Sequence, residues 1–223
     1  MKARFLLVIV LLGARPAVWG RALLVSVPVA DIRSEPAEYV LGPEQDPLQE
    51  TQVLYGERLE VSGEKDGWWR VRVPGQKEWS HARSWEGYPG WIRKEFTIEM
   101  PSDWPEPNAV VSSAKAWLVR PAPDGKVRRV LLSVGTPVVA EENGPSKARA
   151  RCVDGSWGAI DPKDLRWLRA GPKTEGAGAC AASQAELFLG TPYLWGGAER
   201  RFACGSGSHP YRRGLFGVGP SCL

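Results

Sequence analysis

Histidine is scarce in this sequence, and the spacings typical of metal sites are missing. Only two histidines occur, His81 and His209, and the four cysteines form no Cys-x-x-Cys pair. Structural and catalytic zinc sites draw on closely spaced cysteine and histidine side chains. We therefore predict that the chain holds no metal ion, and no motif in it indicates a cofactor.

The sequence also lacks a strong excess of charge of either sign. It contains 29 Lys and Arg residues against 25 Asp and Glu residues. Three of the basic residues, Lys2, Arg4 and Arg15, lie in the first twenty positions, which leaves 26 basic against 25 acidic residues in the rest. A chain so nearly neutral has no overall electrostatic attraction to nucleic acid or anionic lipid. We therefore predict no nucleic-acid partner.

Long hydrophobic runs are absent, since no run reaches the roughly 18 apolar residues that a membrane-spanning helix requires. One shorter apolar run, residues 5–12, follows Lys2 and Arg4 and precedes a small-residue segment that ends at Gly20. This order is typical of a secretory signal peptide. We predict a signal peptide over residues 1–20, a mature chain that starts near Arg21 outside the cytoplasm, and no transmembrane segment after removal of the signal. The alternative is a buried strand of a cytosolic protein.

The cysteines are confined to the last third of the chain, at Cys152, Cys180, Cys204 and Cys222. Two disulfides with three possible connectivities are open, and so is a single reactive thiol. Their spacing does not decide between these alternatives.

Helical periodicity is missing from residues 24–168, and turn-forming residues are frequent, with 25 Gly and 19 Pro in the whole chain. Hydrophobic and arginine residues alternate over 69–73, as expected for a strand with one buried face. Two stretches, 29–92 and 116–160, look like versions of each other. Each has an x-Arg-x-x-Pro opening, an apolar strand broken at a glycine, an alternating strand and a turn that joins glycine to an aromatic residue.

These patterns predict a mainly β protein that contains two small barrels of five or six strands. We expect the first barrel over residues 24–99 and the second over 108–169, joined by a proline-rich linker at 100–107. Small barrels bury little core, so large aromatic side chains matter to them. Four tryptophans are therefore predicted to be core or groove residues: Trp69, Trp91, Trp117 and Trp157.

The double pattern resembles the tandem bacterial SH3-like domains that precede NlpC-type cell-wall cysteine peptidases. The best local matches are Thr-Gln-Val-Leu-Tyr-Gly-Glu at 51–57 and Gly-Tyr-Pro-Gly-Trp-Ile at 87–92. A third match, Gly-Thr-Pro-Tyr-Leu-Trp-Gly-Gly at 190–197, resembles the entry to the catalytic domain of that family. The resemblance implies two SH3-like barrels followed, over 173–223, by a short truncated α+β fragment of papain-like type. It also implies peptidoglycan stem peptides or the cell wall as partners.

The catalytic motif of that family is missing. In the family a cysteine within Asp-Cys-Ser-Gly begins a helix and attacks an amide carbonyl, and a downstream histidine acts as base. Cys222 and Cys204 are the two candidates for this nucleophile, but neither follows an aspartate, and His209 precedes Cys222. His81 is expected to be a solvated loop residue. We predict that the chain as given does not hydrolyse peptides.

The resemblance further implies that the first barrel recognises the free amine of the peptide with a tyrosine and a carboxylate. Tyr88 matches the tyrosine, and Glu50 is the nearest acid, with Glu57 as a rival. Tyr193 and Trp195, in the 190–197 motif, are the remaining predicted substrate-binding residues. The alternative is an exposed loop tyrosine among solvated acids.

Three functional hypotheses follow. The first is a secreted cysteine hydrolase of cell-wall peptides that cuts next to D-glutamate, inactive in this chain. The second is a non-catalytic cell-wall-binding module with a vestigial tail. The third is a gene fragment whose last 26 residues have no selected structure.

Overall fold

The computed structural model describes residues 20–38, 46–122, 124–144, 146–168 and 185–189, together with the backbone of 198–199 and 202–203. The described residues form 17 strands and two 3-10 helices. The prediction of a mainly β chain is therefore confirmed. Residues 1–19 of the predicted signal peptide lie outside the described residues, and so does most of 173–223.

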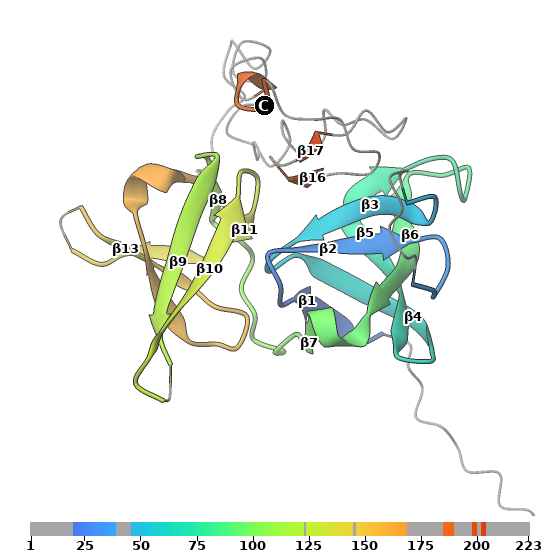
Figure 1. Ribbon diagram of the computed structural model, residues 1–223, viewed down its shortest axis with the longest axis horizontal. Coiled ribbons are helices and arrows are strands. Elements are labelled where there is room, and N and C mark those ends of the chain that lie inside the picture. The colour runs from blue at the N-terminus through green and yellow to red at the C-terminus, as the bar shows by residue number, and fades with distance from the viewer. Residues whose placement is uncertain are drawn as a thin grey trace, which may run out of the picture.

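The first β unit consists of residues 22–99 and contains one antiparallel sheet with the strand order β3-β2-β6-β5-β4-β1-β7 (Figure 1). A 3-10 helix at Lys94–Phe96 leads from β6 into β7. The strands are β1 (Ala22–Val25), β2 (Val29–Arg33), β3 (Gln49–Leu54), β4 (Arg58–Lys65), β5 (Trp68–Glu78), β6 (Glu86–Arg93) and β7 (Thr97–Glu99).

The second β unit consists of residues 109–167 and contains a five-stranded sheet, β10-β9-β14-β13-β12, and a three-stranded sheet, β11-β8-β15. A 3-10 helix at Pro162–Asp164 precedes β15, and the Asp161 side chain caps it by accepting a hydrogen bond from the Lys163 N–H. The strands are β8 (Ala109–Val111), β9 (Lys115–Pro121), β10 (Val127–Ser133), β11 (Pro137–Val138), β12 (Ala140–Glu142), β13 (Ala148–Arg151), β14 (Trp157–Ile160) and β15 (Leu165–Trp167).

A short hairpin follows the two units. It pairs β16 (Ala198–Glu199) with β17 (Phe202–Ala203), and β16 lies close to β3 of the first unit (Figure 1).

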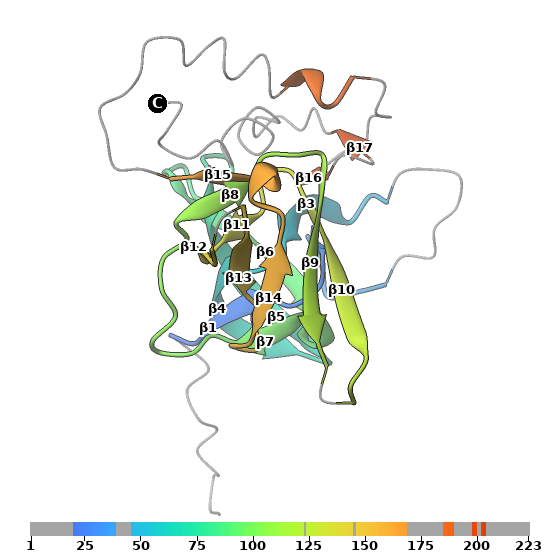
Figure 2. The same ribbon diagram turned by 90° about the vertical axis from the view of Figure 1, so that its left-hand side faces the viewer.

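The two units share a buried core where they meet. Leu24 and Tyr55 of the first unit belong to the same buried cluster as the apolar side chains of the second unit, including Leu118 and Leu132. The Val153 N–H donates a hydrogen bond of 3.0 Å to the Tyr55 hydroxyl across this junction. Figure 1 shows the units side by side, joined by the segment between β7 and β8, and Figure 2 shows them with the second unit in front of the first. The first unit also has a core of its own, built from the inner faces of β1 to β6.

The predicted alternation in β5 is visible in its burial, since Val71 and Val73 are buried while Arg70 and Arg72 are exposed. Trp69 continues this alternation and packs against the core of the first unit beside Val71 and Val73, while Trp68, on the other face, is more deeply buried. The pairing of β5 with β4 shifts register between Val61 and Gly63, where β4 contains one extra residue.

Three of the four tryptophans expected in the core or a groove are partly buried, and one is not. Trp117 is 50% exposed, so its prediction as a core residue is wrong. Its neighbours Ala116 and Leu118 fill the core of the second unit, which places Trp117 on the outer face of β9.

Candidate functional site

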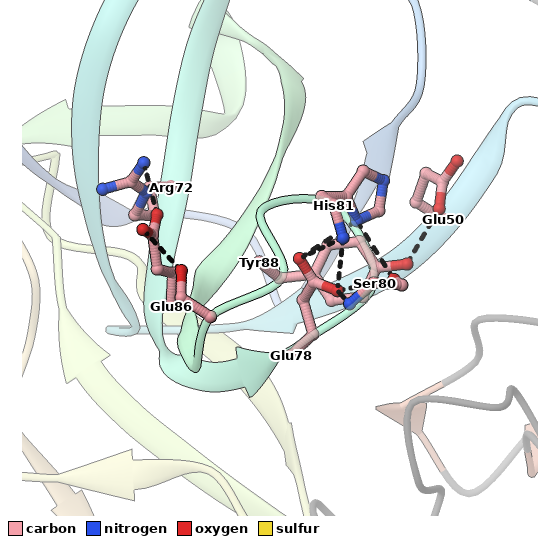
Figure 3. Close-up of polar contacts among 8 residues, drawn as sticks. Glu50, Arg72, Glu78, Ser80, His81, Glu86 and Tyr88 are labelled. Carbon is pink, nitrogen blue, oxygen red and sulfur yellow. Dashed lines mark hydrogen bonds and ion pairs between the residues drawn. The ribbon is translucent and has the colours of Figure 1, made fainter.

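A tyrosine and a glutamate from two strands of the first unit meet at its rim. The Tyr88 hydroxyl, on β6, donates a hydrogen bond of 2.8 Å to Oε2 of Glu50 on β3 (Figure 3). In the sheet, β2 lies between these strands, but it ends at Arg33, which is paired with Trp91. Tyr88 lies beyond that end, so no strand separates its ring from Glu50. Two residues 38 positions apart are thus brought together.

A second carboxylate organises the loop beside this pair. Glu78 ends β5 and is only 3% exposed. Its Oε2 accepts hydrogen bonds of 2.6 Å from both the backbone N–H and the hydroxyl of Ser80, and the His81 N–H donates to the same oxygen at 3.2 Å. His81 Nδ1 lies 3.0 Å from Oε1 of Glu78 (Figure 3). Because a carboxylate only accepts, this geometry assigns the proton of His81 to Nδ1.

The ionisation of Glu78 follows from these contacts. Burial alone raises the pKa of a carboxyl group, but the hydrogen bonds from Ser80 and His81 outweigh it, and the pKa of Glu78 lies below its usual value. Glu78 is therefore an anion at neutral pH, with the imidazole of His81 held against it.

His81 connects the two carboxylates. Its ring meets the Tyr88 ring edge-on, with 5.4 Å between the centroids and 62° between the planes. Such tilted contacts are the favoured geometry of aromatic pairs. The order Glu78, His81, Tyr88, Glu50 is thus a continuous chain of contacts, which fixes the orientation of the tyrosine hydroxyl toward Glu50.

The loop that carries His81, residues 79–85, is held at both ends. Glu78 and Glu86 are opposite each other in the β5–β6 pairing. Glu86 accepts from the Ser84 hydroxyl at 2.9 Å and pairs with Arg72 at 2.9 Å (Figure 3). The same loop exposes Trp79 and Trp85, whose ring centroids lie 5.9 Å apart.

The chemistry that this arrangement supports is the binding of a cation. Glu50 is the partly exposed carboxylate of the group, and the buried Glu78, whose oxygens already contact Ser80 and His81, adds a second negative charge nearby. Within the described ranges, no group of three or more His, Cys, Asp or Glu side chains is placed to hold a metal ion. A partly exposed carboxylate such as Glu50 matches an organic ammonium group, which carries the opposite charge and only donates hydrogen bonds.

The remaining predicted site residues fall into two groups. Glu57, the alternative to Glu50 as the predicted acid, accepts a hydrogen bond of 2.9 Å from the Leu54 N–H. This hydrogen bond stabilises the turn between β3 and β4. Four predicted residues lie outside the described residues: Tyr193, Trp195, Cys204 and Cys222. Of the cysteines, Cys152 is described; it is buried with a free thiol, and burial raises its pKa.

Sequence reasoning missed the role of Glu78 and treated His81 as a solvated side chain. His81 is 43% exposed, yet it contacts Glu78 on one side and meets the Tyr88 ring edge-on on the other. The sequence Glu-x-Ser-His at 78–81 carries a weak signal, because an acid followed by serine two positions later often caps its own turn.

The described part of the chain contains no helix long and apolar enough to cross a membrane. The prediction of a signal peptide concerns residues that the structure does not describe and stays a prediction.

No family model matches the chain. A gamma-D-glutamyl-L-lysine dipeptidyl-peptidase of Bacillus subtilis (strain 168) is 30% identical over 159 residues, which cover 70% of this chain and 50% of that protein. The protein of the same name from Bacillus cereus (strain ATCC 10987 / NRS 248) is 28% identical over 166 residues, or 72% of this chain and 48% of that protein. This chain thus spans about half the length of these relatives.

A solved structure has the same fold. It is an NlpC/P60 family protein from Bacillus cereus ATCC 10987, with a TM-score of 0.72 and 19% sequence identity over 89% of this chain and 72% of that chain. The relatives of this chain, by sequence and by fold, therefore include peptidases and an NlpC/P60 family protein.

Proposed function

We propose that this chain belongs to the NlpC/P60 family and that its first β unit binds the free amino terminus of a cell-wall peptide containing D-glutamate. The names of the two Bacillus relatives and the fold shared with the NlpC/P60 protein support this assignment. A dipeptidyl-peptidase counts two residues from an amino terminus, so its substrate must be recognised at the free amine. On this proposal the two β units are SH3-like barrels of a secreted protein, with the leader-like residues 1–20 as support for secretion.

The hydrogen-bonded pair of Tyr88 and Glu50 is the observation that carries the proposal. An ammonium group has three donors and no acceptor, so it needs several oxygen atoms and one negative charge. The Tyr88 hydroxyl donates its proton to Oε2 of Glu50, which holds that carboxylate in place as the negative charge for the ammonium. The second oxygen of Glu50 supplies a charge-assisted hydrogen bond, which is roughly twice as strong as a neutral one.

Cleavage needs groups that this chain does not supply at matching positions. It contains no Asp-Cys-Ser-Gly and no histidine after His209. A cysteine without a neighbouring base keeps a pKa of about 8.5 and is only a few per cent thiolate at neutral pH. We therefore propose that the chain as given binds its peptide without turning it over.

Binding is tested by calorimetric titration of the full chain with L-Ala-γ-D-Glu-L-Lys and with its N-acetylated form. The free-amine peptide should bind, and acetylation should abolish binding because it removes both the charge and two donors. Tyr88→Phe and Glu50→Gln should each weaken binding by about ten- to a hundredfold, since a hydrogen bond to a charged group contributes about 1.5–3 kcal/mol.

Glu57→Gln is the matched control, because it removes an acid of the same unit while its side-chain oxygen can still accept from Leu54. It should leave the affinity unchanged. Equal affinity for the free and the acetylated peptide, or equal losses in Glu50→Gln and Glu57→Gln, would contradict the proposed site.

Turnover is tested separately by mass spectrometry of the same peptide after prolonged incubation. We expect no dipeptide above the buffer control. Time-dependent product that disappears in Cys204→Ala or Cys222→Ala would refute the inactive assignment and identify the acting thiol. Product that survives both substitutions would indicate a contaminating peptidase.

A further inference from the structure

A groove lined by arginines lies on the outer face of the first β unit, away from the hydrogen bond between Tyr88 and Glu50. It has a volume of about 580 Å³, and its floor crosses four strands. Ala22 is opposite Glu60, Glu60 is opposite Arg72, and Arg72 is opposite Pro89, so one row of side chains runs from β1 to β6. All four residues of this row line the groove.

Arginine is the predominant charged residue in the lining of the groove. Its charged lining residues are Arg21, Arg58, Arg70, Arg72 and Glu60. Residues two positions apart on a strand point to the same face, so Arg70 and Arg72 on β5 lie side by side there, and so do Arg58 and Glu60 on β4. Four guanidinium groups and one carboxylate line the groove, and two further carboxylates, Glu86 and Glu99, pair with Arg72 and Arg21, which leaves a net charge of one.

The arginines are available to a ligand. Arg58 and Glu60 are 3.5 Å apart, and both are about half exposed. Arg72 pairs with Glu86 at 2.9 Å and is also half exposed. Solvent-exposed pairs of this kind contribute at most about 1 kcal/mol, so a ligand can replace the glutamate at little cost. Within the described ranges the exposed Arg70 side chain makes no ion pair.

We propose that this groove binds a phosphate group. Guanidinium groups present paired N–H donors that match phosphate oxygens, and a phosphate has enough oxygens to accept from several arginines at once. A carboxylate offers only two oxygens and would leave donors of the groove unmatched. The chemistry is the same whether the phosphate is a free ion or part of a phosphodiester polymer, and a polymer that crosses the strands can engage the groove along its length.

The experiment titrates the full chain with inorganic phosphate, with poly(glycerol phosphate) and, as a polycarboxylate of similar charge density, with poly-γ-glutamate. Comparing the affinities for the two phosphate probes shows whether the groove prefers the free ion or the polymer. Arg70→Gln combined with Arg72→Gln should raise the Kd for phosphate at least about tenfold, because charge-assisted hydrogen bonds are lost. Arg70→Gln alone should raise the Kd severalfold without changing the thermal midpoint, since that side chain has no ion pair to lose.

The matched control is Arg128→Gln combined with Arg129→Gln, which removes the same charge from exposed positions of β10 in the second unit. It should change the Kd by less than twofold. The proposal is overturned if both double variants weaken binding equally, if no phosphate probe binds, or if poly-γ-glutamate binds as tightly as poly(glycerol phosphate). Because peptide is absent from these titrations, their outcome does not depend on the site at Tyr88.

Discussion

Glu78 shows how one buried carboxylate organises a loop. It is almost inaccessible to solvent, and among the described residues the hydrogen bonds and the ion pair of its carboxylate come from Ser80 and His81, within three residues of it in the sequence. A buried anion is tolerated only when donors surround it. The same contacts present the ring of His81 to Tyr88. The loop conformation and the orientation of Tyr88 therefore depend on the charge of Glu78.

Replacing that charge should destabilise the protein in a way that depends on pH. Glu78→Gln keeps the size of the side chain but turns an amide N–H₂ toward donors, and we expect a loss of about 1–3 kcal/mol at pH 7. The pKa of Glu78 is lowered on folding, so its contribution is present above the unfolded value of 4.5 and is lost as the pH falls through the folded value.

Urea unfolding at pH 7 and at pH 3 measures this contribution. The gap in unfolding free energy between the native chain and Glu78→Gln should shrink at pH 3. Glu86→Gln, at the paired position across the strands, is the control and should cost less, because its carboxylate is partly exposed. A gap of the same size at both pH values would mean that the ionised form of Glu78 is not the stabilising species.

The identity of these partners could not be predicted from the sequence. Tyr88 and Glu50 were named through a family resemblance, and the structure brings them together, while their role with substrate stays a prediction. The contact of His81 with Tyr88 depends on how β5 pairs with β6. That pairing shifts register between Val73 and Lys77, and a register shift of this kind has no local signature in the sequence.

At the scale of the strand, β6 passes so close to β2 that one position cannot carry a side chain. A Cβ at Gly90 would overlap Cγ2 of Ile32 and lie 2.9 Å from the carbonyl oxygen of Arg33. The single pairing of β2 with β6 lies beside this point, at Arg33 and Trp91. The close approach therefore lets β2 join the rest of the sheet.

We expect Gly90→Ala to cost about 1–3 kcal/mol, as overpacking of a dense core typically does. Gly75→Ala is the control on β5, because a Cβ there would make only an ordinary contact of 3.5 Å with Glu57. Thermal unfolding of both variants tests the claim. If the two midpoints fall by the same amount, the close approach at Gly90 is not what limits the side chain.

The alternation of hydrophobic and polar residues was enough to predict strands such as β5, because each strand buries one face. It could not place Trp117, since a tryptophan in an alternating strand is compatible with either face. Only the neighbouring Ala116 and Leu118, which fill the core between the sheets of the second unit, decide the orientation of that strand.

At the scale of the molecule, Tyr55 joins the two β units. Its ring is buried in the shared core, and its hydroxyl accepts from the Val153 N–H. Burial raises the pKa of the Tyr55 hydroxyl far above its usual value, against the opposing hydrogen bond from Val153. The hydroxyl therefore stays neutral in the folded chain under alkaline conditions that ionise an exposed tyrosine.

Tyr55→Phe should leave the buried Val153 N–H without a partner, which costs about 1–3 kcal/mol. For a chain of this size the thermal midpoint should fall by roughly 2–4 °C for each kcal/mol. The native chain should also lose stability as the pH rises above about 10, where the unfolded tyrosine ionises. In Tyr55→Phe the part of this alkaline loss that comes from Tyr55 should be absent, because phenylalanine does not ionise.

Scanning calorimetry at pH 7 and urea unfolding at pH 7 and pH 10.5 test both statements. A midpoint unchanged by the substitution would show that the hydrogen bond to Val153 does not stabilise the junction. An alkaline loss of equal size in both proteins would assign that loss to other groups.

The shared core also limits how these units can be recombined. A β unit that folds as an independent module can be moved between proteins by fusing genes at its linker, but the first unit of this chain would carry Leu24 and Tyr55 into water if it were moved alone. The two β units together are therefore the segment that can be moved between proteins without exposing this core. Chimeras that swap both units together should remain soluble, whereas chimeras cut between β7 and β8 should aggregate.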